Sequence, residues 1–339
     1  MLNFDESRYV GIQRGAVGLA ERIHAAVSDA LAAGVENVHF VGAGGAGILM
    51  QPAAALLQNR STFPTFIDMP AELVVRGAAH LGPRSLVVMP SLSGTTAESV
   101  EALDYCHEKG ARVMALTGHA DTPLADGADV SLVNHAADDT SCESFYLQSL
   151  LVALSIMDRR GELADGEYRR VVGELQTMPE LLLEAKRTFE PRARTFAEQV
   201  QHESYHIITG AGSAWPEAFY YGMCILEEMQ WIRTRPVHAS DFFHGTLELV
   251  EPGVSVILLK GEDASRPLAE RVEKFAPQYT DKVWVLDTAD VDLPGVSPDV
   301  RALVSPAVLA ALLERVSAHL EVLRDHPLTT RRYYKRVAY

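Results

Sequence analysis

One pattern of strand, glycine turn and helix is written twice in this 339-residue chain. An apolar run at 38–41 leads into GAGGAG (42–47), and a second run at 205–209 leads into GAG (210–212). Gly42 and Gly210 stand 168 positions apart, and the apolar runs that begin at Ser85 and Ser255 stand 170 apart. Such a nearly constant offset indicates two copies of one α/β unit.

Two further pairs of apolar runs extend this repeat. VMAL from Val113 matches VWVL from Val283, and we expect 128–133 and 299–304 to form a fourth pair of strands. Helical patterns separate the runs, and alternating strands and helices predict parallel sheets covered on both faces. The expected boundaries are an N-terminal helix at 1–34, a first domain at 35–160, charged interdomain helices at 161–200, a second domain at 201–325 and a tail at 326–339.

The composition favours an acidic globular protein. With 30 Lys+Arg against 45 Asp+Glu the net charge is −15, which argues against nucleic acid or an anionic membrane as partner because both attract positive fields. The three cysteines form no CxxC pair and indicate reduced thiols. No signal peptide is visible, and the most apolar stretch, 147–157, is about half the ~20 residues that a membrane span needs. We therefore expect a cytoplasmic protein.

The run PSLSGTTAES (90–99) predicts an anion site. It follows an apolar strand and opens a helix, whose first N–H groups and positive dipole end attract a compact anion. Four hydroxyl residues surround its glycine, namely Ser91, Ser93, Thr95 and Thr96. A plain helix cap is the alternative interpretation of such a turn, but the density of hydroxyls at the end of a strand favours a ligand site.

GAGGAG differs from the dinucleotide fingerprint. Its spacing is G-x-G-G-x-G, and Arg60 and its neighbours stand where a ribose-binding acid is expected. We interpret the run as a tight turn that offers Gly44 and Gly45 to the same pocket as the 91–96 loop.

The sequence resembles the sugar isomerase (SIS) family. The repeated unit and the SxSGxTxE loop carry this resemblance, and 223–253 (MCILEEMQWIRTRPVHASDFFHGTLELVEPG) together with the ending 326–339 is similar to its fructosamine-6-phosphate deglycase branch. The family implies two tandem SIS domains, each a flavodoxin-like, three-layer parallel sheet flanked by helices. It also implies homodimers or higher homo-oligomers with active sites at subunit interfaces, no metal and no other cofactor, and a sugar-phosphate substrate.

The resemblance also implies a catalytic pair, Glu228 and His244, and makes Lys335 in the tail a possible ring-opening residue. Glu228 stands in a helical pattern (219–232) beside Glu227, so the two side chains point about 100° apart and one is expected in solvent. A partly desolvated Glu228 would have its pKa raised. Asp241 could orient the imidazole of His244 or cap a helix.

These residues suit more than one function. An imidazole and a carboxyl can shuttle a proton between C1 and C2 of a sugar, either to release an amine from a fructosamine 6-phosphate or to interconvert a ketose and an aldose. Ala46, Gly47 and Leu92 depart from the family pattern, which leaves open a sugar that carries a sulfonate or a carboxylate in place of the phosphate. A non-catalytic sugar-phosphate sensor is a third possibility.

Overall fold

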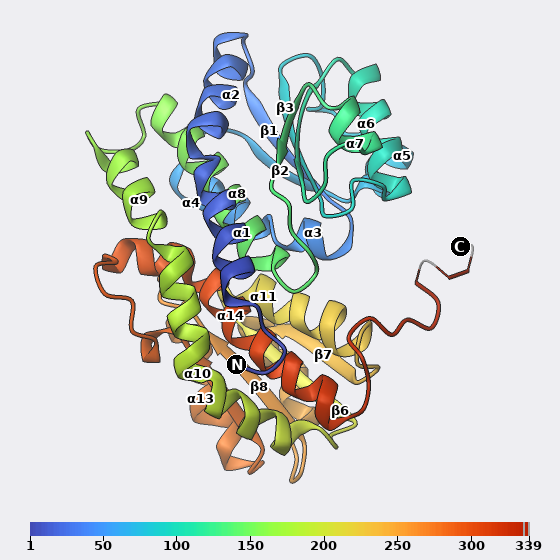
Figure 1. Ribbon diagram of the computed structural model, residues 1–339, viewed down its shortest axis with the longest axis vertical. Helices are drawn as coiled ribbons and strands as arrows, with labels where there is room; N and C mark the ends of the chain where they lie inside the picture. The colour runs from blue at the N-terminus through green and yellow to red at the C-terminus, as the bar shows by residue number, and fades with distance from the viewer. Residues whose placement is uncertain (335, 338–339) are drawn as a thin grey trace. The chain divides into compact units, whose positions relative to one another are not determined.

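The computed structural model describes residues 1–334 and 336–337 and divides the chain into two compact units, each visible in Figure 1. The N-terminal unit is Glu6–Glu180, and the C-terminal unit is Met1–Asp5 with Leu181–Tyr339. The division falls inside helix α10 (Met178–Val200).

The N-terminal unit is built on a parallel sheet in the order β2-β1-β3-β4-β5. Figure 1 shows α5, α6 and α7 on one face of this sheet and α1, α2 and α8 on the other. The strands are β1 (Asn37–Val41), β2 (Thr65–Asp68), β3 (Ser85–Ser91), β4 (Arg112–Thr117) and β5 (Val130–Val133). The helices are α1 (Glu6–Gly18), α2 (Ala20–Ala32), α3 (Gly44–Ile48), α4 (Gln51–Arg60), α5 (Pro70–Arg76), α6 (Ala97–Glu108), α7 (Pro123–Gly127), α8 (Ser141–Arg159) and α9 (Glu167–Leu175).

The C-terminal unit repeats this plan with four parallel strands in the order β7-β6-β8-β9. The strands are β6 (Tyr205–Gly210), β7 (Arg233–His238), β8 (Ser255–Lys260) and β9 (Val283–Asp287). Besides α10, the α-helices are α11 (Ala214–Tyr220), α12 (Ala239–Phe242), α13 (Arg266–Phe275) and α14 (Pro298–Leu323). A π-helix, η1 (Tyr221–Glu227), and three 3₁₀ turns, η2 (Thr246–Leu249), η3 (Ala276–Gln278) and η4 (Thr288–Asp290), complete it.

Both central strands are buried on both faces, as parallel strands covered by helices must be. All seven residues of β3 and all six of β8 are buried. On β8, Ile257 packs into a cluster with α10, α11 and α14, whereas its neighbours Val256 and Leu258 pack with α12 and α13. Helix α14 is long and apolar enough to cross a membrane, but 89% of its most apolar window is buried, so it is a core helix of its unit.

The predicted fold class is confirmed: both units are parallel sheets flanked by helices. One expected pair of strands is wrong, because 299–304 lies in α14 and not in a strand. Ser297 and Pro298 begin that helix, with proline at its first position, where the missing N–H has no helical partner to lose. The N-terminal helical pattern also divides into α1 and α2.

Candidate functional site

The carboxyl ends of β1 and β3 meet where the winding of the N-terminal sheet reverses. The chain leaves β1 towards β2 at one edge and leaves β3 towards β4 on the other side. In open parallel sheets, ligands bind at this switch point. The two loops that leave these strands are 42–47 and 92–96, the loops that the sequence singled out. We call this place the first switch point.

Glycines pack the first of these loops backbone to backbone. A Cβ on Gly42 would lie 2.6 Å from the Cα of Gly47 and 2.9 Å from Cγ of Pro90, so a side chain there would clash with the other end of its own loop and with β3. Gly44 has a φ of +53° and, with Gly45, begins α3. The first amides of a helix have no carbonyl partner within it. This loop therefore offers backbone N–H groups rather than side chains.

Hydroxyl groups line the second loop. Ser91 is buried, and its Oγ accepts a hydrogen bond from the backbone N of Gly94 at 3.0 Å. The hydroxyl of Thr95 donates to Oγ of Ser93 at 3.1 Å. Thr96 occupies the N-cap position of α6, yet its side chain makes no capping hydrogen bond. The hydroxyl of Thr96 therefore does not act as the helix cap that the alternative interpretation expected. The first amides of α6 lie beside this residue.

Glu228, in the C-terminal unit, follows a distorted helix. Its backbone N donates to the carbonyl of Met223 at 3.1 Å, five residues back, which is the π-helical spacing. The sequence predicted a regular helix over 219–232, but α11 gives way to η1 and the chain then turns. π-helical turns occur frequently at functional sites. The half-buried carboxylate of Glu228 forms an ion pair with Arg331, Nε to Oε1 at 2.9 Å.

The adjacent Glu227 points elsewhere. It is exposed, and its Oε1 accepts hydrogen bonds from the backbone N and the hydroxyl of Thr234, at 3.1 and 2.6 Å. As the sequence indicated, one of the two glutamates faces solvent. The other, Glu228, is the one held by a charged partner.

His244 lies just after α12 in an open pocket of about 610 Å³. Its side chain is exposed, and its backbone N donates to the carbonyl of Asp241 at 2.9 Å. The cap of α12 is His238, whose Nδ1 accepts from the N of Ser240, so the capping role considered for Asp241 is wrong. The residues that line the pocket are Trp215, Arg235, Pro236, Val237, His238, Asp241, His244, Gly245 and Thr246.

The candidate residues fall into three groups. The 42–47 and 91–96 loops belong to the N-terminal unit, and Glu228 and His244 belong to the C-terminal unit. Within that unit, Glu228 is not among the described residues that line the pocket of His244. Lys335 lies outside the described residues. Among residues that the structure describes, no three His, Cys, Asp or Glu side chains gather to hold a metal ion. Sequence reasoning missed Arg331, although it stands in the same tail as Lys335.

The C-terminal unit has a switch point of its own, between the ends of β6 and β8, and an aspartate fills it. Oδ2 of Asp263 accepts from the backbone N of Ser213 at 2.7 Å and from its hydroxyl at 2.5 Å. Oδ1 accepts from the backbone N of Ser265 at 2.7 Å. Gly212, with a φ of +56°, allows this approach, since a Cβ there would lie 2.3 Å from the carboxylate. A carboxylate of the chain itself occupies the anion position here.

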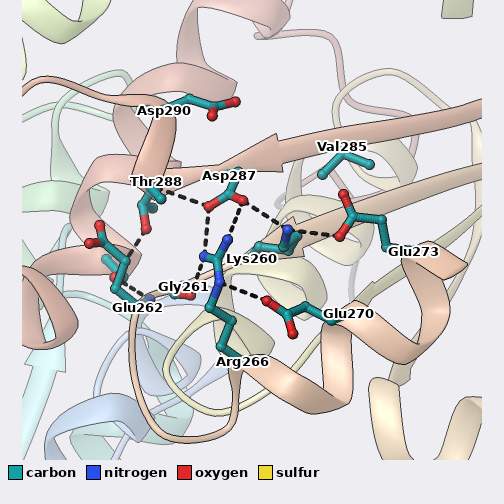
Figure 2. Close-up of polar contacts among 12 residues, drawn as sticks. Lys260, Gly261, Glu262, Arg266, Glu270, Glu273, Val285, Asp287, Thr288 and Asp290 are labelled. Atoms are coloured by element: carbon teal, nitrogen blue, oxygen red, sulfur yellow. Dashed lines mark hydrogen bonds and ion pairs between the residues drawn. The ribbon is translucent and has the colours of Figure 1, made fainter.

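Beside this second switch point, an ion network joins the ends of β8 and β9, as Figure 2 shows. Both oxygens of Asp287 accept from Arg266, at 2.8 and 2.6 Å, and Lys260 adds a third contact at 2.9 Å. Lys260 and Arg266 also pair with Glu273 and Glu270. Despite burial, which acts the other way, these hydrogen bonds lower the pKa of Asp287 to about 2. The network leaves little unmatched charge at this edge of the sheet.

Comparison with known proteins finds the same plan elsewhere. The SIS domain family model matches residues 33–157. The chain is 29% identical to fructosamine deglycase FrlB of Bacillus subtilis over 94% of this chain and 97% of that protein. It is 28% identical to the fructoselysine 6-phosphate deglycase of Escherichia coli K12 over 92% of this chain and 89% of that protein.

Solved structures agree. A candidate phosphosugar isomerase from Salmonella typhimurium LT2 matches with a TM-score of 0.87 and 30% identity, over 96% of this chain and 97% of the other. One from Bacillus subtilis matches with a TM-score of 0.89 and 29% identity, over 96% and 99%. The similarity therefore runs through both units of the chain.

Proposed function

Because this chain belongs to the SIS family, we propose that it is a sugar-phosphate deglycase, which cleaves fructosamine 6-phosphates to glucose 6-phosphate and a free amine. The observation that carries this proposal is the similarity to two deglycases over more than nine-tenths of the chain.

The anion site of this proposal is the first switch point. Ser91, Ser93, Thr95 and Thr96 would donate hydroxyl protons to the phosphate, and the amides of α6 and of Gly44 and Gly45 would add backbone donors. The hydroxyl of Thr96 supports this assignment, because it makes no capping hydrogen bond to α6.

The acid–base steps belong to Glu228 and His244. His244 would assist opening of the sugar ring. Glu228 would take a proton from C1 of the open-chain ketoamine and return it at C2, while the N–H proton of the amine passes to O2, so that the C2 carbonyl becomes a hydroxyl and the C1–N bond an imine. Water then adds to C1, the amine leaves with a proton, and the aldehyde of glucose 6-phosphate remains. This sequence is a hydrolysis with no net redox change, and it uses general acid–base catalysis alone.

The same pair could interconvert a ketose and an aldose without an amine. The candidate phosphosugar isomerases among the solved relatives keep this second function open, for a 6-phosphorylated or 6-sulfonated sugar. A non-catalytic sugar-phosphate sensor is the least favoured, because it needs neither Glu228 nor His244.

For the assembly we propose a cytoplasmic homodimer or higher homo-oligomer, with active sites at subunit interfaces and His244 supplied from either subunit. The exposure of His244 and the absence of Glu228 from the residues described around its pocket support a site completed by a second copy. The net charge of −15 supports the proposal that neither nucleic acid nor a membrane is a partner.

The test is a direct assay of both reactions. The purified protein is incubated with fructosyl amino acid 6-phosphates and, separately, with fructose 6-phosphate, and the products are followed by NMR. We expect the wild type to release glucose 6-phosphate and free amine. In Glu228→Gln the rate of this release should fall by a factor of about 10³ or more, since a general base supplies rate enhancements of that order. Glu227→Gln is the matched control and keeps its activity. Interconversion of sugars without amine release would establish the isomerase instead, and full activity of Glu228→Gln would refute the assignment of Glu228.

A further inference from the structure

The end of the chain lies against the segment that carries Glu228. Residues 324–334, which we call the C-terminal strap, follow α14. Gln230 donates through Nε2 to the carbonyl of His326 at 2.7 Å, and Arg324 donates to the carbonyl of Gln230 at 3.3 Å. The backbone N of Leu328 donates to Glu321 of α14 at 2.9 Å. The strap is thus fastened both to its own helix and to the turn after η1.

Trp231, three residues after Glu228, is strained and is held by the strap. Its φ is +56°, in the left-handed region that bulky residues rarely adopt. The indole contacts the ring of His326, with centroids 4.6 Å apart, and the guanidinium of Arg332 lies 4.1 Å from the ring centroid. Such a conformation persists only where its surroundings fix it. The turn after Glu228 therefore depends on the strap.

Arg331 is the strap residue that reaches Glu228. Its guanidinium is fixed from within the strap, because Nη1 donates to the carbonyls of Leu328 at 2.6 Å and of Thr330 at 3.1 Å. Its side chain is 13% exposed, against 31% for that of Glu228. A fixed, largely buried cation thus meets a carboxylate that is still partly open to solvent.

We propose that Arg331 is a positioning residue that orients the carboxylate of Glu228 and favours its ionised form, so that Glu228 enters the reaction as a base. This inference rests on the proposed function. A nearby opposite charge favours the charged form of a carboxyl, and a fixed donor restricts the rotamers that its partner can adopt. The desolvated carboxyl expected from the sequence is in fact paired with a cation.

Other ionisable groups surround the same carboxylate. Cys224 stands one helical turn before Glu228, and burial raises the pKa of its thiol to about 12, with the charges of Glu228, Glu217 and Glu227 adding to this effect. From the strap, Arg331 contacts Glu228 directly, whereas Arg332 and His326 contact the indole of Trp231. Arg331 of the strap is the cation that the structure places against Glu228.

The experiment compares Arg331→Met and Arg331→Lys with Arg332→Met, which removes only the cation over Trp231. For Arg331→Met we expect kcat to fall about 100-fold with KM nearly unchanged, the loss typical of a misplaced catalytic group. Arg331→Lys should recover part of the loss, because it restores the charge without the fixed fork. The kcat of Arg332→Met should stay within about 5-fold of the wild-type value, because the variant loses only one exposed cation–π contact.

A second measurement follows Glu228 itself. In protein labelled with ¹³C at the glutamate side-chain carboxyl, the signal missing from Glu228→Gln identifies this residue, and its titration midpoint should lie higher in Arg331→Met. An unchanged midpoint, or kcat equal to the wild type, overturns the proposal. The proposal is also overturned if Arg331→Met and Arg332→Met lose the same amount of kcat and the same amount of melting temperature. That result would mean that the strap has a structural role only. If the wild type converts neither substrate, the proposed function fails, and the titration alone decides on Arg331.

Discussion

At the ends of β1 and β3, no hydrogen bond found among the described residues joins the hydroxyls and amides of the loops to a carboxylate, whereas at the ends of β6 and β8 an aspartate accepts such bonds. There, Ser213 and Ser265 donate to Asp263, and the nearby cations are matched by Asp287 and its neighbours (Figure 2). Both places are switch points, where a parallel sheet binds ligands. Under the proposed function, the repeated unit holds one anion site open to the substrate and a second switch point occupied by its own carboxylate. The difference teaches that a switch point is available to an anion when no carboxylate of the chain already accepts from its donors.

The largest effect is expected at the closed switch point. Asp287→Asn leaves the buried Lys260 and the half-buried Arg266 with one partner fewer. Breaking a buried ion pair costs about 3–5 kcal/mol of unfolding free energy. Urea unfolding followed by tryptophan fluorescence measures this, because Trp215, Trp231 and Trp284 all lie in the C-terminal unit. Turnover of the sugar phosphate should be kept. A loss below 1 kcal/mol would show that the network does not hold this edge together.

The pH dependence of the unfolding free energy gives a second test of Asp287. The pKa of Asp287 falls from 3.8 to about 2 on folding, so its ionised form stabilises the folded state at every pH above about 4. That contribution, about 2 kcal/mol for a shift of this size, is lost as pH falls from about 4 to about 2. The variant Asp287→Asn should lack this part of the pH dependence. The same acid slope in both proteins would contradict the assignment.

The next effect concerns the open switch point. Ser93→Ala combined with Thr96→Val removes two donors to the substrate anion, each worth about 1.5 kcal/mol when the acceptor is charged. We expect KM for the sugar phosphate to rise about 100-fold, with the melting temperature unchanged. Ser213→Ala is the matched control in the second unit, where the melting temperature should fall and KM should not move. An unchanged KM in the double variant would place the anion elsewhere.

The smallest effect tests whether the closed site can be reopened. Asp263→Ser leaves the donors of Ser213 and Ser265 without their carboxylate, at a cost of about 1–3 kcal/mol. Sulfate should restore part of this stability, because an anion that binds only the folded state stabilises it. Asp263→Asn, which keeps acceptor oxygen and shape, is the control and should respond less to sulfate. Equal responses of the two variants would show that Asp263 does not stand in for an anion.

The sequence predicted the central strands because they are the most apolar. The runs at Ser85 and Ser255 became β3 and β8, which are buried throughout. The edge strands β2 and β7 were missed, since β7 alternates arginines with polar residues and contains Pro236, which only an edge strand tolerates. The run at 299–304 was misassigned, because a short apolar run does not by itself distinguish a buried strand from a buried helix.

The candidate site was predicted in parts. The hydroxyl loop could be found because its residues are adjacent in sequence and follow a strong strand. The ion pair of Glu228 with Arg331 could not, since it joins an internal turn to the end of the chain and depends on tertiary packing. The π-helix before Glu228 and the left-handed Trp231 were equally hidden, because neither changes the apolar pattern.

The most direct test of the account is a crystal structure of the protein grown with glucose 6-phosphate, the proposed product. We predict one phosphate per chain, held by the hydroxyls of Ser91, Ser93 and Thr96 and the amides at the start of α6. The second switch point should still be closed by Asp263. A phosphate seated on Ser213 and Ser265 in place of Asp263, or a sugar phosphate bound while the 91–96 loop stays empty, would contradict it.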